Sequence, residues 1–199
     1  MKKNKKNFTG FLIKIYNAVV FLFSKYIFSF RKYSIASRDL QEIKNEMEIS
    51  GEVIISEIDR LNVSELNTEL NQLQKNKTLI RLSKGMRCFI ARIDGNLAGI
   101  SWISYRRSSN EGVKLTLNPG EALLLESFTF PEYRKRGVQT ALIDRRLFFL
   151  KETDYRKVYV IYEPGNEYSI RALKRNGFTE MKSIMLIRIF NKYFQFDRK

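Results

Sequence analysis

Residues 124–143 (LLESFTFPEYRKRGVQTALI) combine a strand-like run, a proline, a basic turn with a glycine, and the start of an amphipathic helix. Pro131 cannot donate to a strand ladder, so the strand ends there, and Gly137 can adopt backbone angles that are closed to other residues. The first N–H groups of the following helix have no acceptor within it, and the helix dipole adds positive charge at the same end. The basic residues at 134–136 add further positive charge. This pattern predicts an anion site, and a pyrophosphate is the ligand that it favours.

The segment PEYRKRGVQTALI resembles the acyl-CoA-binding motif R/Q-x-x-G-x-G/A of the GNAT superfamily of N-acetyltransferases, with Arg134 and Gly137 at the first two fixed positions. Gln139 stands where the family usually has glycine or alanine, and Lys135 stands where many members have another glycine. A second block, EPGNEYSIRALKRNGF, is similar to the family's N-x-x-S/A…GF segment, and the upstream GMRCFIARIDGNLAGISWI looks like the hairpin that precedes the motif. The resemblance covers about residues 52–190, and three blocks in order are more specific than one motif.

This resemblance implies an α+β fold with α/β/α layers and a mixed, mostly antiparallel central sheet of the GNAT type, in which two strands splay apart. Acetyl-CoA is the implied cosubstrate. Its pantetheine would lie between the splayed strands, and its pyrophosphate would bind the main-chain N–H groups of residues 136–140. No metal is expected. The residues predicted to contact the cofactor are Phe128, Thr129, Arg134, Lys135, Arg136, Gly137, Val138, Gln139, Thr140, Asn166 and Ser169.

An amine that attacks a thioester arrives protonated, so acyl transfer needs a general base, directly or through water. Glu126 stands on the strand before the motif, where relatives often carry an acid, and it is the predicted base; Glu121 is a weaker candidate. The competing interpretation is that Glu126 pairs with a nearby arginine. Leu173 occupies the place of the family's tyrosine that protonates the departing thiolate. Tyr168 is the predicted substitute, and a surface or packing role is its alternative.

Composition excludes several other chemistries. The chain has no histidine, which rules out histidine triads, histidine metal sites and a histidine base. The single cysteine, Cys88, stands in the apolar run CFIARI and is expected to be a core residue in a reducing compartment. Of the net charge of +15, residues 1–32 carry +8 and residues 171–199 carry +6, which leaves +1 for the middle. Because the middle is nearly neutral, the charge distribution argues against nucleic acid as the partner.

The first 32 residues form a basic, apolar segment in which a helical stripe of apolar residues runs from Phe8 to Phe30. Lys14 and Lys25 leave too short an uncharged run for a spanning helix, and Arg31 and Lys32 fit a secretory signal poorly. Two interpretations stay open: a helix in an anionic membrane interface, or a helix that packs on protein. The first makes the protein cytoplasmic and peripheral on the inner membrane face.

The chain is therefore divided into four parts: a helix at 1–32, a connecting segment at 33–51, an acyltransferase domain at 52–190 and a basic tail at 191–199. Within the connection, Tyr33–Ala36 is expected to be a short extended piece, and residues 38–49 favour a helix. The other expected helices are 62–74, 138–151 and 166–176; the expected strands are 52–58, 87–93, 97–105, 114–117, 121–130, 157–162 and 183–190. Asp94-Gly95-Asn96 is a hairpin signal between two of these strands.

We therefore expect an acyl-CoA-dependent N-acyltransferase that acts on an amine, as a monomer or a homodimer. An amino sugar, a lipid-linked intermediate or a membrane-associated amine is the expected acceptor. The first alternative is a CoA-binding module of the same fold without turnover, because Gln139 and Leu173 depart from the family pattern. The second is a basic nucleic-acid-binding protein that uses the charged ends of the chain.

Overall fold

A computed structural model of the chain describes residues 13–17, 19–21, 28–43, 52–66, 68–106, 108–110, 112–190 and 192–198. The helical elements are η2 (Val63–Leu66), α2 (Gln72–Ser83), η3 (Pro131–Tyr133), α3 (Val138–Glu152) and α4 (Glu167–Arg175). The strands are β1 (Phe28–Asp39), β2 (Ile54–Ile58), β3 (Arg87–Ile93), β4 (Asn96–Ser104), β5 (Ser108–Asn110), β6 (Val113–Leu115), β7 (Glu121–Thr129), β8 (Lys157–Tyr162), β9 (Thr179–Ile189) and β10 (Lys192–Arg198).

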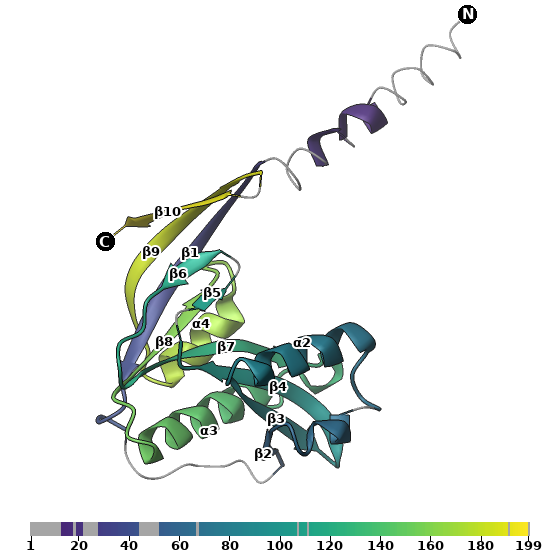
Figure 1. The fold of residues 1–199 in the computed structure, drawn as a ribbon, viewed down its shortest axis with the longest axis vertical. Coiled ribbons are helices and arrows are strands. Elements are labelled where there is room, and N and C mark those ends of the chain that lie inside the picture. The colour runs from purple at the N-terminus through teal and green to yellow at the C-terminus, as the bar shows by residue number, and fades with distance from the viewer. Residues whose placement is uncertain are drawn as a thin grey trace, which may run out of the picture.

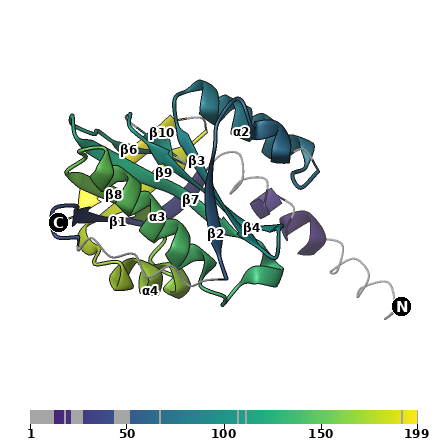
Figure 2. The same cartoon turned by 90° about the horizontal axis from the view of Figure 1, so that it is seen from below.

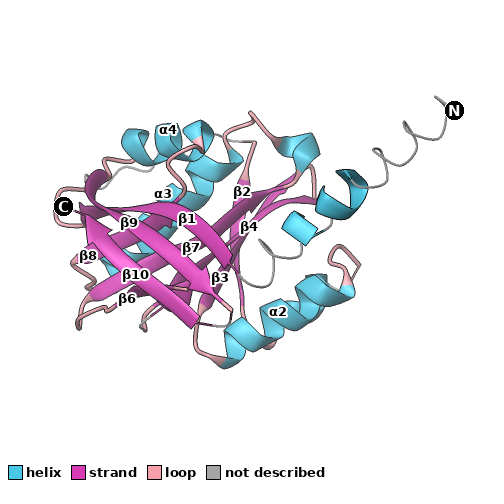
Figure 3. Ribbon diagram, turned by 90° about the horizontal axis from the view of Figure 1, so that it is seen from above, coloured by secondary structure: helices cyan, strands magenta, loops and turns pink. Residues whose placement is uncertain are grey.

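Eight strands form one twisted sheet in the order β10-β9-β1-β8-β7-β4-β3-β2, while β5 and β6 form a separate hairpin (Figure 1). Every pairing in the large sheet is antiparallel except that of β7 with β8. Helix α2 lies on one face of the sheet, and α3 and α4 lie on the other (Figures 2 and 3). The predicted α+β fold with a mixed, mostly antiparallel sheet is confirmed.

Strands β7 and β8 separate halfway along their length. They pair over Glu121–Leu124 and Lys157–Val160, and beyond Leu124 strand β7 stays on β4 alone. A β-bulge marks the separation: Leu125 pairs with Trp102 and Phe128 with Ile100, so two residues of β7 oppose one of β4. Glu126 sits in the bulge with a φ of 29°. Because a bulge bends the strand that carries the extra residue, β7 turns away from β8 here and a gap opens between them.

Two apolar layers hold these elements together. Between the sheet and α3, the buried residues include Phe89, Leu142, Leu147 and Leu150. On the face toward α2, they include Ile90, Trp102, Leu82 and Cys88. Burial raises the pKa of the Cys88 thiol to about 12, so it stays protonated at neutral pH. Cys88 is a core residue, as predicted.

Gly99 on β4 allows α3 to approach the sheet beside the separated strands. A Cβ atom at this position would lie 2.8 Å from Val138 Cγ1 and 2.9 Å from the main-chain oxygen of Phe128. We expect Gly99→Ala to lower the free energy of unfolding by about 1–3 kcal/mol, because the inserted methyl group must push helix and strand apart. Thermal unfolding followed by circular dichroism measures this loss.

Gly165→Ala is the matched control, since a Cβ there meets nothing within 4 Å and its φ is not in the left-handed region. Its melting temperature should stay close to that of the wild type. Equal melting temperatures for both variants would show that the packing at Gly99 is not tight.

The segment 33–51 was expected to connect a helix with the domain. The extended conformation predicted for Tyr33–Ala36 is confirmed, but this piece is part of the domain's own sheet rather than a connection. Residues 28–39 form β1, which lies inside the sheet between β8 and β9. Residues 28–30, expected at the end of the first helix, and residues 38 and 39, expected in the acidic helix, are therefore strand rather than helix. The alternating pattern FSFRKYSIA suits a strand, and pairing with two distant strands selects that conformation. Residues 40–43 of the predicted acidic helix form a bend and a turn, and residues 44–49 lie outside the described residues.

At the other end of the chain, the predicted basic tail 191–199 contains a strand. Residues Lys192–Arg198 form β10 and pair with β9 along its length. The helix predicted at 62–74 is also displaced: η2 covers Val63–Leu66, and α2 starts only at Gln72. Asn71 caps α2 in a reciprocal capping box with Gln74. The remaining predicted strands and helices are present, with ends that shift by a few residues.

Residues 13–17 and 19–21 are helical, and the rest of the predicted stretch up to residue 27 lies outside the described residues. No helix within the described ranges is long and apolar enough to cross a membrane.

Candidate functional site

A cleft of about 880 Å³ opens where β7 and β8 separate. Its walls come from the end of β7, the turn after it, the first turns of α3, the end of β8 and the start of α4. Of the predicted site residues, Arg136 and the weaker base candidate Glu121 are not part of its lining. Those that line the cleft are Glu126, Phe128, Thr129, Arg134, Lys135, Gly137, Val138, Gln139, Thr140, Asn166, Tyr168 and Ser169. The Glu121 carboxylate instead accepts hydrogen bonds from Tyr159 and Asn118.

The start of α3 faces this cleft without a side-chain cap. Gly137 is its N-cap residue, has a φ of 76° and offers no side-chain acceptor to the first N–H groups. Lys135 also takes a left-handed conformation, with a φ of 66°. These N–H groups, the helix dipole and the cations of Arg134 and Lys135 point to one place. The geometry fits a bound anion such as a pyrophosphate.

The Arg136 side chain turns away from this place. Its guanidinium forms an ion pair with Glu52 and lies 3.9 Å from the Asp94 carboxylate. The hydrogen bond that the Arg136 guanidinium donates to Glu52 raises the pKa of Arg136. The expectation that three basic side chains share the turn is therefore wrong for Arg136, because nearby carboxylates attract it.

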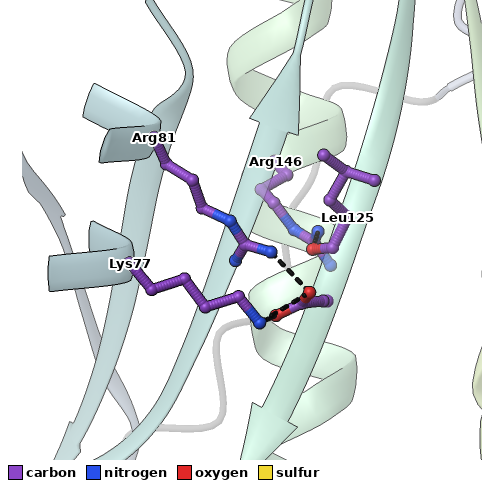
Figure 4. Close-up of polar contacts among 5 residues, drawn as sticks. Lys77, Arg81, Leu125 and Arg146 are labelled. Atoms are coloured by element: carbon purple, nitrogen blue, oxygen red, sulfur yellow. Dashed lines mark hydrogen bonds and ion pairs between the residues drawn. The ribbon is translucent and has the colours of Figure 1, made fainter. Parts of the chain in front are cut away.

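Glu126 lies in the bulge of β7, and its carboxylate contacts two cations of α2, Lys77 and Arg81, whose side chains are shown in Figure 4. Lys77 Nζ lies 3.0 and 2.9 Å from the two carboxylate oxygens, and Arg81 donates a short hydrogen bond to Oε1. Burial raises the pKa of Glu126, but the hydrogen bonds and charges of Arg81 and Lys77 outweigh it, so the net pKa is lowered. The carboxylate is therefore charged at neutral pH. In this structure Glu126 pairs with Arg81, which is the contact that the alternative interpretation expected.

Helix α4 supplies the second wall of the cleft. The Asn166 side chain accepts a hydrogen bond of 3.1 Å from the N–H of Ser169 and caps the helix, as predicted. Tyr168 is 67% exposed and stacks under the Arg171 guanidinium at 5.0 Å. Leu173, at the position of the expected tyrosine, is buried in the core with 4% exposure. The Leu173 side chain has no proton that it could donate to a leaving thiolate, whereas the Tyr168 hydroxyl has one. Of these two residues, only Tyr168 has the chemistry of a general acid.

Arg146 on α3 is a residue of the site that sequence reasoning missed. It is only 1% exposed, and its guanidinium donates to the main-chain oxygens of Trp102 (3.0 Å) and Leu125 (3.4 Å) and to Ser127 Oγ (2.7 Å). These acceptors flank the bulge, so Arg146 ties β4 to the bent part of β7 (Figure 4). Burial lowers the pKa of Arg146 to about 9, which leaves it cationic at neutral pH.

Two signals in the sequence could have found the missed residues. Arg146 stands four residues after Leu142 and four before Leu150, on the buried stripe of the motif helix, where an arginine is rare. Lys77 and Arg81 are four residues apart and so share one helix face. Their partner is Glu126, 49 and 45 residues away, and no local pattern indicates that contact.

No group of three carboxylate or cysteine side chains suited to a metal ion occurs among the described residues.

The cleft combines parted strands, an uncapped helix start and cations, which are the features of a site for a phosphate-bearing ligand. The sequence profile described as "Acetyltransferase (GNAT) family" matches residues 54–178. Since this match covers more than half of the chain, the chain belongs to the GNAT acetyltransferase family.

Solved structures share the fold. A GNAT-family protein from Novosphingobium aromaticivorans has a TM-score of 0.56 at 16% identity, covering 81% of this chain and 66% of its own. A tandem GNAT protein of the clavulanic acid biosynthesis pathway has a TM-score of 0.57 at 19% identity (84% and 56%). The glucosamine N-acetyltransferase region of a fungal β-N-acetylglucosaminidase has a TM-score of 0.56 at 17% identity (89% and 23%).

The chain thus spans about two thirds or less of the length of these proteins. A search of curated proteins found no match.

Proposed function

We propose that the protein transfers an acyl group, most simply acetyl from acetyl-CoA, to the nitrogen of an amine. The observation that carries this proposal is the single cleft in which β7 and β8 part beside the uncapped start of α3. Strand β7 does not pair with β8 beyond Leu124, so its open edge around Phe128 and Thr129 suits pairing with the amides of pantetheine. The turn with Arg134, Lys135 and Gly137 suits the pyrophosphate. The residues present therefore fit a nucleotide thioester as cosubstrate.

In the proposed reaction, the amine nitrogen attacks the thioester carbonyl carbon, the C–N bond forms and the C–S bond breaks. Holding both reactants in one cleft supplies a large share of the rate. Glu126 accepts the proton of the incoming ammonium, directly or through a water molecule, and its charged state at neutral pH suits that role. Tyr168 is the proposed donor to the leaving thiolate. A thiolate leaves readily without full protonation, so Leu173 does not preclude turnover.

The acceptor is an amine. The fungal glucosamine N-acetyltransferase region shares the fold, and this supports an amino sugar as the first acceptor to test. Contact with an anionic membrane through residues 1–32, a cytoplasmic location on the inner membrane face, and the choice between monomer and homodimer stay predictions.

Acetyl-CoA should protect the protein against heat. A ligand at about 100 times its Kd adds about 2.7 kcal/mol to the free energy of unfolding, which raises the melting temperature by about 5–10 °C in a chain of this size. Arg134→Glu should weaken binding at least about tenfold, because it replaces a charge-assisted contact with repulsion. Differential scanning fluorimetry and titration calorimetry measure the two effects.

Lys84→Glu is the charge-matched control, because Lys84 is exposed at the end of α2 and does not line the cleft. Its affinity for acetyl-CoA should equal that of the wild type. The absence of any thermal shift with wild-type protein at millimolar acetyl-CoA would refute the proposed function.

A second candidate is a CoA-binding module without turnover, and the burial of Leu173 at the tyrosine position favours it. Thiol release from acetyl-CoA in the presence of a panel of amino sugars, diamines and amino acids distinguishes the two. Heat protection without thiol release for any amine would favour the binding module.

A further inference from the structure

Three strands form an arm at the end of the sheet beyond β8: β10, β9 and the first half of β1 (Figures 1 and 3). Residues directly opposite each other in antiparallel strands lie on the same face. The register aligns Phe28 with Ile189, and Phe30 with Ile187 and Phe194. One face of the arm, here called the outer arm face, therefore carries a block of large apolar side chains. Its exposed members are Phe28, Phe30, Met185, Ile189, Phe194 and Phe196.

The opposite face of the arm packs on the domain. Tyr33, Ile184 and Leu186 on that face are each less than 5% exposed. Tyr193 is pressed against Gly112, where a Cβ atom would lie 2.5 Å from its ring. The Gln195 side chain accepts from the main-chain N–H of Lys114 (2.7 Å) and donates to its oxygen (3.3 Å). The arm is therefore fixed in place, and the outer arm face is a preformed apolar surface rather than the loose end of the chain.

The side chains of the outer arm face are exposed by 38–56%. Six large apolar side chains together on one sheet face are more than single scattered surface residues, which need no explanation. Such a contiguous patch is typical of a contact with a partner or a membrane.

The charge of the arm indicates whether the outer arm face contacts a protein partner or a membrane. Lys32 and Lys192 are exposed on the outer arm face itself, opposite Met185 and Ile189. Residues 28–32 and 183–196 contain no acidic residue. The pairing of β1 with β9 also places Arg31 and Lys32 directly opposite Leu186 and Met185, so basic residues from both ends of the described chain meet in the arm. Strands β10 and β9 and the first half of β1 together hold six basic and two acidic residues, so the arm is a positively charged part of the protein.

A second copy of the chain is a poor match for this surface. Joining two outer arm faces would bring together two basic ends of chains that each carry +15. An anionic lipid surface complements both features at once, since aromatic and aliphatic side chains enter the interface and lysines reach the headgroups. The helical residues 13–17 and 19–21 also expose apolar side chains, among them Ile13, Val19 and Phe21, and they precede the arm in the chain.

We propose that the outer arm face docks the protein on an anionic lipid surface, with its phenylalanines in the interface and Lys32 and Lys192 at the headgroups. This contact does not depend on the cofactor cleft, and its failure would leave the acyltransferase proposal intact. If both hold, the acceptor amine is presented at or near that surface.

Cosedimentation of the full chain with vesicles tests the proposal. Vesicles of phosphatidylcholine with phosphatidylglycerol should bind the protein, and vesicles of phosphatidylcholine alone should bind it at least about tenfold more weakly. The double variant Phe30→Ser/Phe194→Ser should lower binding to the anionic vesicles at least about tenfold. The control Leu61→Ser/Leu73→Ser changes two exposed leucines outside the arm, 91% and 78% exposed, and should bind like the wild type.

A second double variant, Lys32→Glu/Lys192→Glu, keeps the apolar face intact and tests the charge, should the serine variant fail to fold. It should also lose at least about tenfold in binding, while its thermal shift with acetyl-CoA stays unchanged. Unchanged vesicle binding in both arm variants would overturn the proposal and assign any binding to residues 1–27. Absent vesicle binding, together with a dimer in sedimentation equilibrium that the serine variant dissociates, would assign the face to a second copy instead.

Discussion

Replacing Glu126 with glutamine is expected to lower kcat for acetyl transfer by about 10²–10⁴-fold while the Kd for acetyl-CoA stays unchanged. The carboxylate lines the cleft from the bulge of β7, and glutamine keeps its shape but cannot accept the proton of the ammonium. Steady-state kinetics with a saturating amine, together with calorimetry of acetyl-CoA binding, separate the two quantities. The exposed Glu65→Gln is a matched control, since Glu65 stands outside the cleft and should leave kcat unchanged.

The two cations on α2 provide a sharper version of this test. Burial alone raises the pKa of Glu126, and the hydrogen bonds and charges of Arg81 and Lys77 bring it below its usual value. Lys77→Met removes one of these cations, so the pKa of Glu126 should rise. The acidic limb of kcat/KM against pH reports the base of the free enzyme, and it should therefore move to higher pH. Lys84→Met, on the same stretch of chain but away from Glu126, should leave the profile in place.

The same ion pairs make a contribution to stability whose pH dependence has a fixed sign. Because the folded pKa of Glu126 is lowered, the stabilisation is present above the unfolded pKa and is lost as pH falls through the folded pKa.

An unchanged profile of kcat/KM against pH for Lys77→Met, combined with full kcat in Glu126→Gln, would show that Glu126 only links β7 to α2. The base would then be another group or the solvent.

The strand–turn–helix unit of the cleft could be predicted from sequence because its determinants are local. Pro131 ends the strand, Gly137 takes the left-handed conformation at the start of α3, and Asn166 caps α4 through its own side chain. Each of these effects acts within about four residues, so a short stretch of sequence specifies it. The residues that line the cleft could also be predicted, because these local units meet wherever β7 and β8 are neighbouring strands.

The arm could not be predicted in this way because its determinants are distant. The stretch around Phe28 and Phe30 fits both a helical stripe and an alternating strand, and only pairing with β9, more than 150 residues away, decides between them. Lys192–Arg198 is similarly basic enough to suggest a tail, but the exposed edge of β9 provides its partner. The contacts of Glu126 with α2 also depend on the sheet being complete. Long-range pairing thus explains the two unpredicted strands at the ends of the chain and the unpredicted contact of Glu126 with α2.

Replacing Arg146 with methionine is expected to destabilise the protein by about 2–4 kcal/mol and to weaken acetyl-CoA binding at least about tenfold. The substitution leaves the main-chain oxygens of Trp102 and Leu125 without their buried donor, and each unsatisfied group costs about 1–3 kcal/mol. The methionine variant no longer has to bury a guanidinium cation, and this gain offsets part of that cost. Because these oxygens flank the bulge, the separation of β7 from β8 should relax, and with it the gap for pantetheine.

Arg146→Lys distinguishes geometry from charge. It retains the cation, but an ammonium on a flexible stem cannot span Trp102, Leu125 and Ser127 as the planar guanidinium does. We therefore expect the lysine variant to lose affinity for acetyl-CoA nearly as much as the methionine variant. Leu150→Met, buried on the same helix away from the cleft, controls for packing and should cost less than about 1.5 kcal/mol with no change in Kd. If both Arg146 variants bind acetyl-CoA like the wild type while melting at lower temperature, the arginine stabilises the fold without shaping the cleft.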